Sequence, residues 1–185
     1  MFTKQEQEYL LRLAHEAIEH YLGTGKELIV GKANISSFLQ ENRACFVTLT
    51  LNKELRGCIG HLQAIQPLYK DVVENAMGAA FQDPRFPPLK HDELDNIEIE
   101  VSVLSEARQL SYQNREELVQ GLRPQIDGVI IEKGECGATY LPQVWEELSS
   151  PEEFLSSLCL KAGLPENEWT KGDLRVSTYT VEIIK

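Results

Sequence analysis

The sequence has 185 residues, of which 42% are hydrophobic and 25% charged, as in an ordinary globular protein. The formal net charge of −11 argues against nucleic acid or an anionic membrane as the main partner, because like charges repel. No apolar run approaches the roughly 18 residues that a membrane span needs, and the N-terminus lacks the apolar core of a secretion signal. A cytoplasmic location is therefore expected by default.

Cysteines and histidines are spaced too widely to predict a metal site. The four cysteines form no CxxC pair, and the four histidines form no HxH or HxxxH pair, whereas zinc ligands normally come in such pairs. We therefore predict free thiols and no metal, and the sequence identifies no cofactor. P-loop, GxGxxG, HExxH and GxSxG motifs are also missing, which argues against the familiar nucleotide-binding, zinc-protease and serine-hydrolase chemistries.

The first predicted element is a helix over residues 3–22. Thr3 and Glu6 have the spacing of a capping box, and Gly23 is a suitable end for the helix. Apolar residues recur at helical spacing along this segment and predict one buried face. A short helical turn is expected over residues 36–40.

A β-hairpin and a second helix are predicted next. Alternation of apolar residues with threonine predicts a strand over residues 45–51, and residues 52–54 are expected to turn the chain so that 55–61 runs back beside it. Pro67 is a good first residue for a helix rich in small side chains. That helix must end before residues 83–89, where three prolines fall within five residues.

The remaining elements include further strands and hairpins. We predict a strand over 97–104, a short helix over 114–120, a hairpin turning near Gly134, a helix from Pro151, and a closing strand over 174–183. Hairpins rather than regular strand–helix alternation predict an α+β fold with a largely antiparallel sheet flanked by helices. The length predicts one domain over residues 1–185, built as two lobes if the proline-rich stretch 84–88 crosses between them.

The hexapeptide LRGCIG, residues 55–60, is the main candidate site. On a regular strand Arg56 and Cys58 point to the same face, so the guanidinium and the thiol are expected about 6–7 Å apart. A cation at that distance favours the thiolate, which is the reactive form of cysteine. Gly57 and Gly60 leave the backbone bare, so its N–H groups can meet a ligand oxygen. This interpretation predicts a reactive thiol or an anion-binding surface on a rigid strand.

A structural interpretation of the same residues is also open. Cysteine is often simply buried, glycine in a strand often marks a bulge or a close crossing, and Arg56 can pair with Glu98 or Glu100 across the sheet. A cysteine nucleophile normally uses a histidine base. His61 is nearest in sequence but is expected on the opposite face unless a bulge intervenes, and His91 can approach only through the fold.

Asp83, Arg85 and Glu100 complete the candidate site. Asp83 and Arg85 can flank a polar ligand, or the segment 83–86 can serve as a structural staple in which Asp83 accepts backbone hydrogen bonds. Glu100 can act as a general acid or base or as a metal ligand, or it can be a solvated surface group. If it is buried, it needs a cationic partner such as Arg56.

Several motifs, in this order, make the chain resemble the AMMECR family, also called AmmeMemoRadiSam system protein A: LRGCIGHLQAIQPL, AAFQDPRFPPL, IEIEVSVL, DGVIIE, ATYLPQVWEEL and FLSSLCLKAGL. The resemblance implies an α+β fold of two unequal lobes, with the hexapeptide near the cleft between them. It implies a shared pathway or complex with a radical S-adenosylmethionine enzyme and a Memo-type protein, but no reaction. The polar positions that it marks as the site are Arg56, Cys58, Asp83, Arg85 and Glu100.

This sequence departs from the family pattern at two positions. Lys53 stands where relatives often have glycine, so a different type of hairpin turn is expected. His61 stands where a small hydroxyl residue is common, which argues against a family-wide catalytic role for it.

Three functional interpretations follow. In the first, the protein is an enzyme or the substrate-holding part of one, with Cys58 as nucleophile or redox-active thiol, Arg56 as its activator and anion anchor, and Glu100 as an acid–base or orienting group. In the second, it is a non-catalytic adaptor whose hexapeptide docks the radical enzyme or the Memo-type protein. In the third, the hexapeptide has a structural role only.

Overall fold

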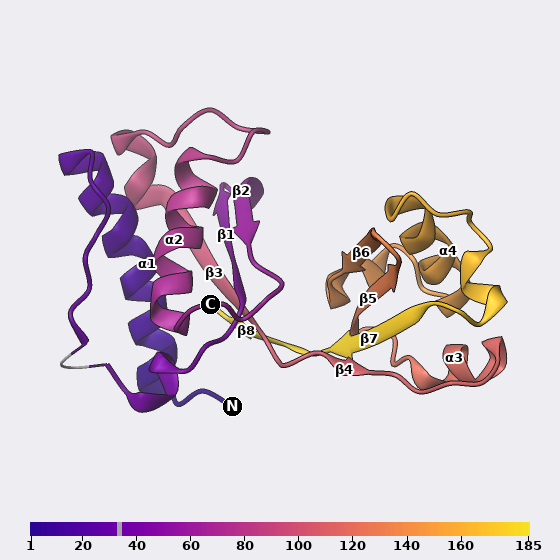
Figure 1. The fold of residues 1–185 in the computed structure, drawn as a ribbon. Helices are drawn as coiled ribbons and strands as arrows, with labels where there is room; N and C mark the ends of the chain where they lie inside the picture. The colour runs from indigo at the N-terminus through magenta and orange to yellow at the C-terminus, as the bar shows by residue number, and fades with distance from the viewer. Residues whose placement is uncertain (33–34) are drawn as a thin grey trace. The chain divides into compact units, whose positions relative to one another are not determined.

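The structure is a computed structural model, and it describes residues 1–32 and 35–185. The chain divides into two compact units, shown as ribbons in Figure 1. The first unit comprises Met1–Leu104 and Glu182–Lys185, and the second comprises Ser105–Val181. Each unit has its own hydrophobic core. Helices and two antiparallel sheets confirm the predicted α+β class, although the strands divide between two sheets of four.

The first unit is a sheet with two helices on one face (Figure 1). Its strand order is β2 (Glu54–Gly60), β1 (Cys45–Leu51), β3 (Ile97–Leu104) and β8 (Val181–Ile184). Helices α1 (Lys4–Thr24) and α2 (Leu68–Phe81) pack against each other and against this sheet. The alternation in β1 places Val47 and Leu49 in the core, whereas Thr48 is half-buried on the other face of the sheet.

Local signals in the sequence explain where these helices begin and end. Thr3 and Glu6 form the predicted capping box of α1. The helix ends at Gly25, whose φ of 68° is in the left-handed region, rather than at the predicted Gly23. Pro67 is the residue before α2. The small side chains of α2 let it pack closely against β2: a Cβ at Gly57 would lie 2.1 Å from the backbone oxygen of Ala79.

The β1–β2 hairpin turns through Asn52 and Lys53, both at positive φ. A turn with two positive φ angles is the usual two-residue hairpin connection, which favours asparagine and glycine. Lys53 has φ 68°, so it adopts the left-handed conformation that glycine adopts readily.

The second unit holds the other sheet, in the order β4 (Arg108–Gln109), β7 (Arg175–Tyr179), β5 (Gly128–Lys133) and β6 (Cys136–Tyr140). Its helices are α3 (Arg115–Gly121) and α4 (Pro151–Lys161). In its core the rings of Trp145 and Phe154 stack with centroids 3.8 Å apart. Among the described residues, 3₁₀ turns lie at Ser37–Gln40, His91–Asn96, Pro142–Glu146 and Glu168–Lys171.

The predicted closing strand over residues 174–183 is in fact two strands. β7 pairs with β5 in the second unit, whereas β8 lies beside β3 in the first. Between them, Thr180 forms hydrogen bonds with Ser105 instead of joining a ladder: its N–H donates to Ser105 Oγ and its C=O accepts the Ser105 N–H. Alternation of residue types predicts strand, but it does not show that the strand changes sheets.

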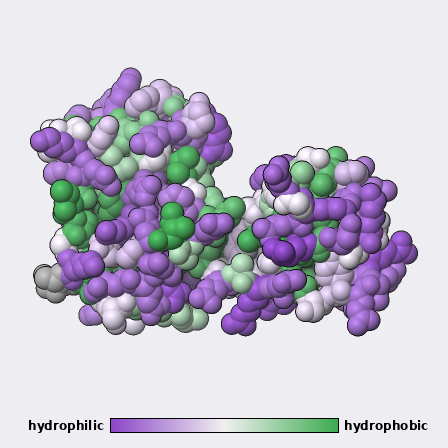
Figure 2. Space-filling view, viewed as in Figure 1, coloured by the Kyte–Doolittle hydropathy of each residue, from purple (hydrophilic) through white to green (hydrophobic). Residues whose placement is uncertain are grey.

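Hydrophilic residues cover most of the face of each unit that Figure 2 shows, and hydrophobic residues form small patches between them. Among the described residues, none of the helices combines the length and the apolar character that crossing a membrane requires.

Candidate functional site

A β-bulge separates Arg56 from Cys58. Cys58 lies opposite Thr48, but Leu55 lies opposite Thr50, so three residue steps of β2 span two steps of β1. The extra residue breaks the alternation on which the predicted pairing of Arg56 with Cys58 depended. The expectation that the Arg56 guanidinium stands beside the sulfur is therefore corrected.

Arg56 is buried and forms an ion pair with Glu93 instead. Its Nε and Nη2 donate to the two carboxylate oxygens of Glu93 at 2.7 and 3.0 Å. The guanidinium holds the pKa of Glu93 below its ordinary value. The possible pairing of Arg56 with Glu98 or Glu100 is thus also corrected, because the 3₁₀ turn before β3 supplies the partner.

One donor of this buried guanidinium remains unused. Arg56 Nη1 has no hydrogen-bond partner in the part of the chain that the structure describes. The half-buried ring of Phe86 lies nearby, with its centroid 6.0 Å from Arg56 Cζ and 5.5 Å from Arg85 Cζ. An unpaired buried donor is costly, so a ligand oxygen at Nη1 would be bound favourably.

Cys58 is half-buried on β2 and is held by three polar contacts. Thr48 Oγ1 donates to its sulfur at 3.3 Å. On the outer edge of β2, its N–H donates to Asp83 Oδ2 at 2.9 Å and its C=O accepts from Arg85 Nη2 at 3.4 Å. The segment after α2 therefore satisfies backbone groups that the edge strand would otherwise leave open.

Asp83 and Arg85 form the second ion pair of the site. Arg85 Nε and Nη2 donate to the buried carboxylate of Asp83 at 2.9 and 2.7 Å. Arg85, helped by the N–H groups of Cys58 and Arg85, holds the pKa of Asp83 far below its ordinary value. In turn the hydrogen bond to Asp83 raises the pKa of Arg85. The Arg85 side chain is 54% exposed, and its Nη2 also donates to the Cys58 carbonyl oxygen.

Glu100 lies on the same sheet face as Cys58 without contacting it. Both residues are opposite Thr48, one on each side of β1. Two strand spacings separate them by roughly 10 Å. The half-buried carboxylate of Glu100 accepts from Lys185 Nζ at 2.8 Å and from Ser102 Oγ at 3.3 Å. Its cationic partner is thus Lys185 rather than Arg56.

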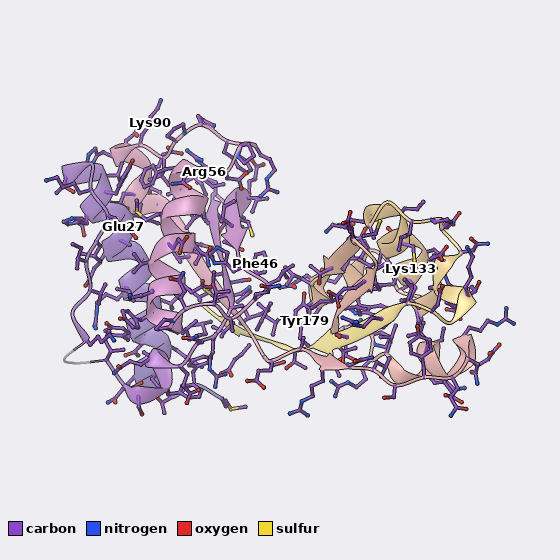
Figure 3. All side chains as sticks on the ribbon, in the orientation of Figure 1. Glu27, Phe46, Arg56, Lys90, Lys133 and Tyr179 are labelled. Carbon is purple, nitrogen blue, oxygen red and sulfur yellow. The ribbon has the colours of Figure 1, made fainter. Side chains whose placement is uncertain are left out.

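The two glycines of the hexapeptide face protein atoms rather than open space. The space beside Gly57 is filled by the backbone of α2 at Ala79. The space beside Gly60 is filled by the ring of Phe46, since a Cβ there would lie 2.3 Å from that ring. Figure 3 labels Phe46 and Arg56 among the side chains of this unit. The expected bare backbone is corrected: these glycines permit close packing of the helix and of an aromatic ring.

Neither candidate histidine base is hydrogen-bonded to Cys58. His61 Nδ1 lies 2.7 Å from Asp71 Oδ1 on α2, on the helix side of the sheet, as strand alternation predicted. His91 Nε2 lies 3.1 Å from the carbonyl oxygen of Leu22. Glu93 and Thr48 are two further residues of the site that were not predicted from the sequence. The hairpin register could have indicated Thr48, but nothing local links Glu93 to Arg56, 37 residues away.

Residues 11–184 match the AMMECR1 family model. The chain belongs to the AMMECR1 family. An AMMECR1 relative from Methanopyrus kandleri is 40% identical over 191 residues, covering 99% of this chain and 89% of the relative. A relative from Pyrococcus abyssi is 43% identical over 188 residues, covering 96% and 89% of the two chains.

A solved structure extends the likeness to the fold. The crystal structure of an uncharacterised protein from Pyrococcus horikoshii has a TM-score of 0.88 and 40% identity to this chain. The match covers 98% of this chain and 92% of the chain in the crystal structure. The comparisons thus identify the AMMECR1 family and fold, and they describe this relative as uncharacterised.

Proposed function

We propose that this AMMECR1 protein is an enzyme, or the substrate-holding component of one, with Cys58 as its reactive thiol. The observation that carries the proposal is the surroundings of the sulfur. Thr48 Oγ1 donates to Sγ at 3.3 Å, and the Arg85 guanidinium donates to the carbonyl oxygen of Cys58 at 3.4 Å. A hydrogen-bond donor and a cation beside a partly exposed sulfur are typical of reactive cysteines.

The two arginines define the kind of substrate that the site would hold. Arg56 Nη1 is an unused buried donor, and Arg85 is half-exposed beyond its contact with Asp83. Phe86 lies within 6.0 Å of both guanidinium carbons. We assign to Arg56 the role of anion anchor and to Arg85 the role of stabilising a thiolate. A substrate with a carboxylate or phosphate group fits these donors.

Asp83 and Glu100 have supporting roles in this proposal. Asp83 positions both Arg85 and the backbone of Cys58. Glu100 would orient a substrate on the same sheet face, about two strands from the sulfur. The reaction partners proposed from the family resemblance are a radical S-adenosylmethionine enzyme and a Memo-type protein.

Thiol alkylation tests the proposal directly. Iodoacetamide labelling of the folded protein, followed by peptide mass spectrometry, compares Cys58 with Cys136, which is also half-buried and serves as an internal control. We expect Cys58 to react faster than Cys136, and Arg85→Gln to slow Cys58 by about tenfold, the effect of removing one adjacent charge. Labelling of Cys136 should not change. Equal rates at the two cysteines, or no effect of Arg85→Gln, contradict the proposal.

A non-catalytic adaptor is the second candidate function. Both arginines are already paired with carboxylates, and the large apolar residues Leu55, Leu62 and Ile65 are exposed in and after the hexapeptide. Such a surface suits a protein partner. In this case capture of the purified radical enzyme by the immobilised protein would survive Cys58→Ser and be lost in Ile65→Asp. If instead Cys58→Ser abolishes a cellular phenotype while capture is retained, the enzyme proposal is favoured.

A further inference from the structure

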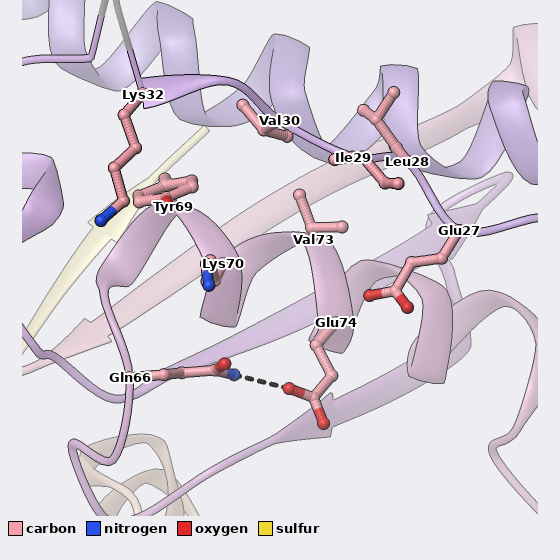
Figure 4. A pocket seen from close by; sticks show the side chains of 10 residues that line it. All are labelled: Glu27, Leu28, Ile29, Val30, Lys32, Gln66, Tyr69, Lys70, Val73 and Glu74. Carbon is pink, nitrogen blue, oxygen red and sulfur yellow. Dashed lines mark hydrogen bonds between the residues drawn. The ribbon is translucent and has the colours of Figure 1, made fainter.

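A pocket of about 420 Å³ opens on the first unit, between helix α2 and the segment 27–32 that follows α1. Figure 4 shows the side chains that line it, from this segment on one side and from α2 and Gln66 on the other. Cys58, Arg56 and Arg85 are not among them. The pocket is therefore separate from the Cys58 site, and its own residues define what it can bind.

The pocket has a cationic end and an anionic end. In Figure 4 the ammonium groups of Lys32 and Lys70 lie on the left, and the carboxylates of Glu27 and Glu74 lie on the right. Glu74 accepts a hydrogen bond from Gln66 Nε2 at 2.5 Å, but none of the four charged groups forms an ion pair with a residue that the structure describes. Unpaired charges of opposite sign at the two ends suit a ligand that itself carries both charges.

The segment 27–32 also has backbone groups that can bind a ligand. Over residues 27–31, the N–H and C=O groups form no hydrogen bond with residues that the structure describes. Leu28 and Val30 are half-buried, whereas Ile29 between them is 94% exposed, which is the alternation of an extended strand. Since residues of both faces line the pocket, the pocket runs along the backbone edge of the segment. An extended peptide at this edge can form main-chain hydrogen bonds with it.

Apolar side chains line the pocket between its charged ends, and one hydroxyl of the lining is unsatisfied. Val30 and Val73 lie between the two ends in Figure 4. Tyr69 is buried, and its hydroxyl has no hydrogen-bond partner in the described part of the chain. Because an unpaired buried hydroxyl is costly, an acceptor atom of a ligand at Tyr69 would be bound favourably. Figure 4 places Tyr69 at the cationic end, which suits the carboxylate of a ligand.

We propose that this pocket binds a short peptide with free termini and apolar side chains. The ammonium group of the peptide lies against Glu27 and Glu74, and its carboxylate lies against Lys32 and Lys70. The peptide therefore runs in the same direction as the segment that follows α1, and its amide groups bond to the backbone edge of that segment. Its carboxylate also accepts from the Tyr69 hydroxyl, and its side chains pack on the apolar lining. A compound that carries only one of the two charges satisfies only one end of the pocket.

Isothermal titration calorimetry of the full chain with the tripeptide Leu-Ala-Leu tests the proposal. Two capped forms of the same peptide, the N-acetyl form and the C-terminal amide, each lack one terminal charge. We expect the free peptide to bind, and each capped form to have a Kd at least about threefold higher, because an exposed ion pair contributes modestly to binding. Equal Kd values for the three peptides, or no binding of the free peptide, overturn the proposal.

Two variants that each remove one charge test the direction of the bound peptide. Lys70→Gln should raise the Kd of the free and N-acetyl peptides but not that of the amide, which has no carboxylate to contact the lysine. Glu74→Gln should raise the Kd of the free peptide and the amide but not that of the N-acetyl form. Both side chains are exposed, so both variants should keep the circular dichroism spectrum of the wild type. The reverse pattern, or Kd values that neither variant changes, overturns the proposal.

Lys90→Gln is the matched control, because this exposed lysine belongs to the same unit but does not line the pocket. It should leave all three Kd values unchanged. Cys58→Ser should also bind the free peptide with an unchanged Kd, and a loss of binding in this variant would overturn the proposal by showing that the peptide occupies the Cys58 site. The peptide result is independent of the iodoacetamide result, so either proposal can fail while the other holds.

Discussion

Each charged side chain assigned to the Cys58 site has a partner of opposite charge within hydrogen-bonding distance. Arg56 pairs with Glu93, Arg85 with Asp83, and Glu100 with Lys185. The site is therefore close to neutral as a whole, and only some of its polar atoms remain free to contact a ligand. Those atoms are Arg56 Nη1, the exposed part of Arg85, and the sulfur itself.

Asp83 provides a residue-scale prediction about stability and pH. Its pKa is lowered in the folded protein, so its ionised form stabilises the fold at pH values above its unfolded pKa of about 3.9, and that contribution is lost as pH falls below this value. Asp83→Asn should lower the free energy of unfolding at pH 7 by about 1–3 kcal/mol, because a charged acceptor of four N–H donors is lost. Urea denaturation at pH 7 and at pH 3 measures the free energy of unfolding of the wild type and of Asp83→Asn.

The difference in the free energy of unfolding between the wild type and Asp83→Asn should be smaller at pH 3 than at pH 7. The matched control is Asp95→Asn, an exposed aspartate on the 3₁₀ turn before β3, which should change the free energy by less than about 0.5 kcal/mol. A destabilisation by Asp83→Asn that stays the same at pH 3 would show that the charge is not the cause.

At the scale of elements, the hairpin that carries the hexapeptide has two irregularities in its backbone. Its turn places Asn52 and Lys53 at positive φ, and a bulge lies opposite the step from Leu49 to Thr50. The bulge separates Arg56 from Cys58, so one residue can pair with Glu93 while the other faces Thr48. The irregular backbone thus creates the two distinct environments of the site.

Lys53→Gly should stabilise the protein by about 1 kcal/mol. A side chain in the left-handed region is strained, and glycine removes that strain. Thermal denaturation measures the gain as a higher Tm. Gly134→Ala is the reciprocal variant, because Gly134 has φ 59° in the turn of the β5–β6 hairpin, and it should lower the Tm. A Tm that falls in Lys53→Gly would show that the lysine side chain contributes more than the strain costs.

Most elements could be predicted from residue patterns, whereas the contacts of the site could not. Capping residues, prolines and alternation indicate α1, α2, β1 and β3 because these signals act within a few residues of each other. The bulge at Arg56 has no local signal and depends on the register with β1. Glu93 is brought to Arg56 by tertiary packing alone. Strand parity was therefore a reliable guide for His61 and failed for Arg56.

At the scale of the whole molecule, the two units differ in how the chain builds them. The second unit is one continuous segment, whereas the first needs residues from both ends of the chain. In the first unit, strand β8 contributes the buried Ile184, and the Glu182 carboxylate accepts a hydrogen bond from the Phe2 N–H at 2.9 Å. Both tryptophans, Trp145 and Trp169, belong to the core of the second unit.

Removing residues 181–185 should therefore weaken one unit selectively. The first unit loses a strand and a buried isoleucine, which should cost at least about 2 kcal/mol. Tryptophan fluorescence, which reports the second unit, should keep its denaturation midpoint. Far-ultraviolet circular dichroism, which reports both units, should show a new transition at lower urea. Midpoints that fall together by both probes would show that the two units unfold as one.

The position of β8 also bears on how the protein forms during synthesis. Ribosomes deliver β3 long before β8, with the entire second unit made in between. Until β8 has been made, the nascent sheet has an unpaired edge at β3, and such edges recruit other strands. The segment between β3 and β8 has a hydrophobic core of its own, so it can fold before β8 is made. In the folded segment Thr180, directly before β8, is hydrogen-bonded to Ser105, directly after β3. A chain that stalls before β8 is made would therefore be more prone to aggregate than one that includes β8.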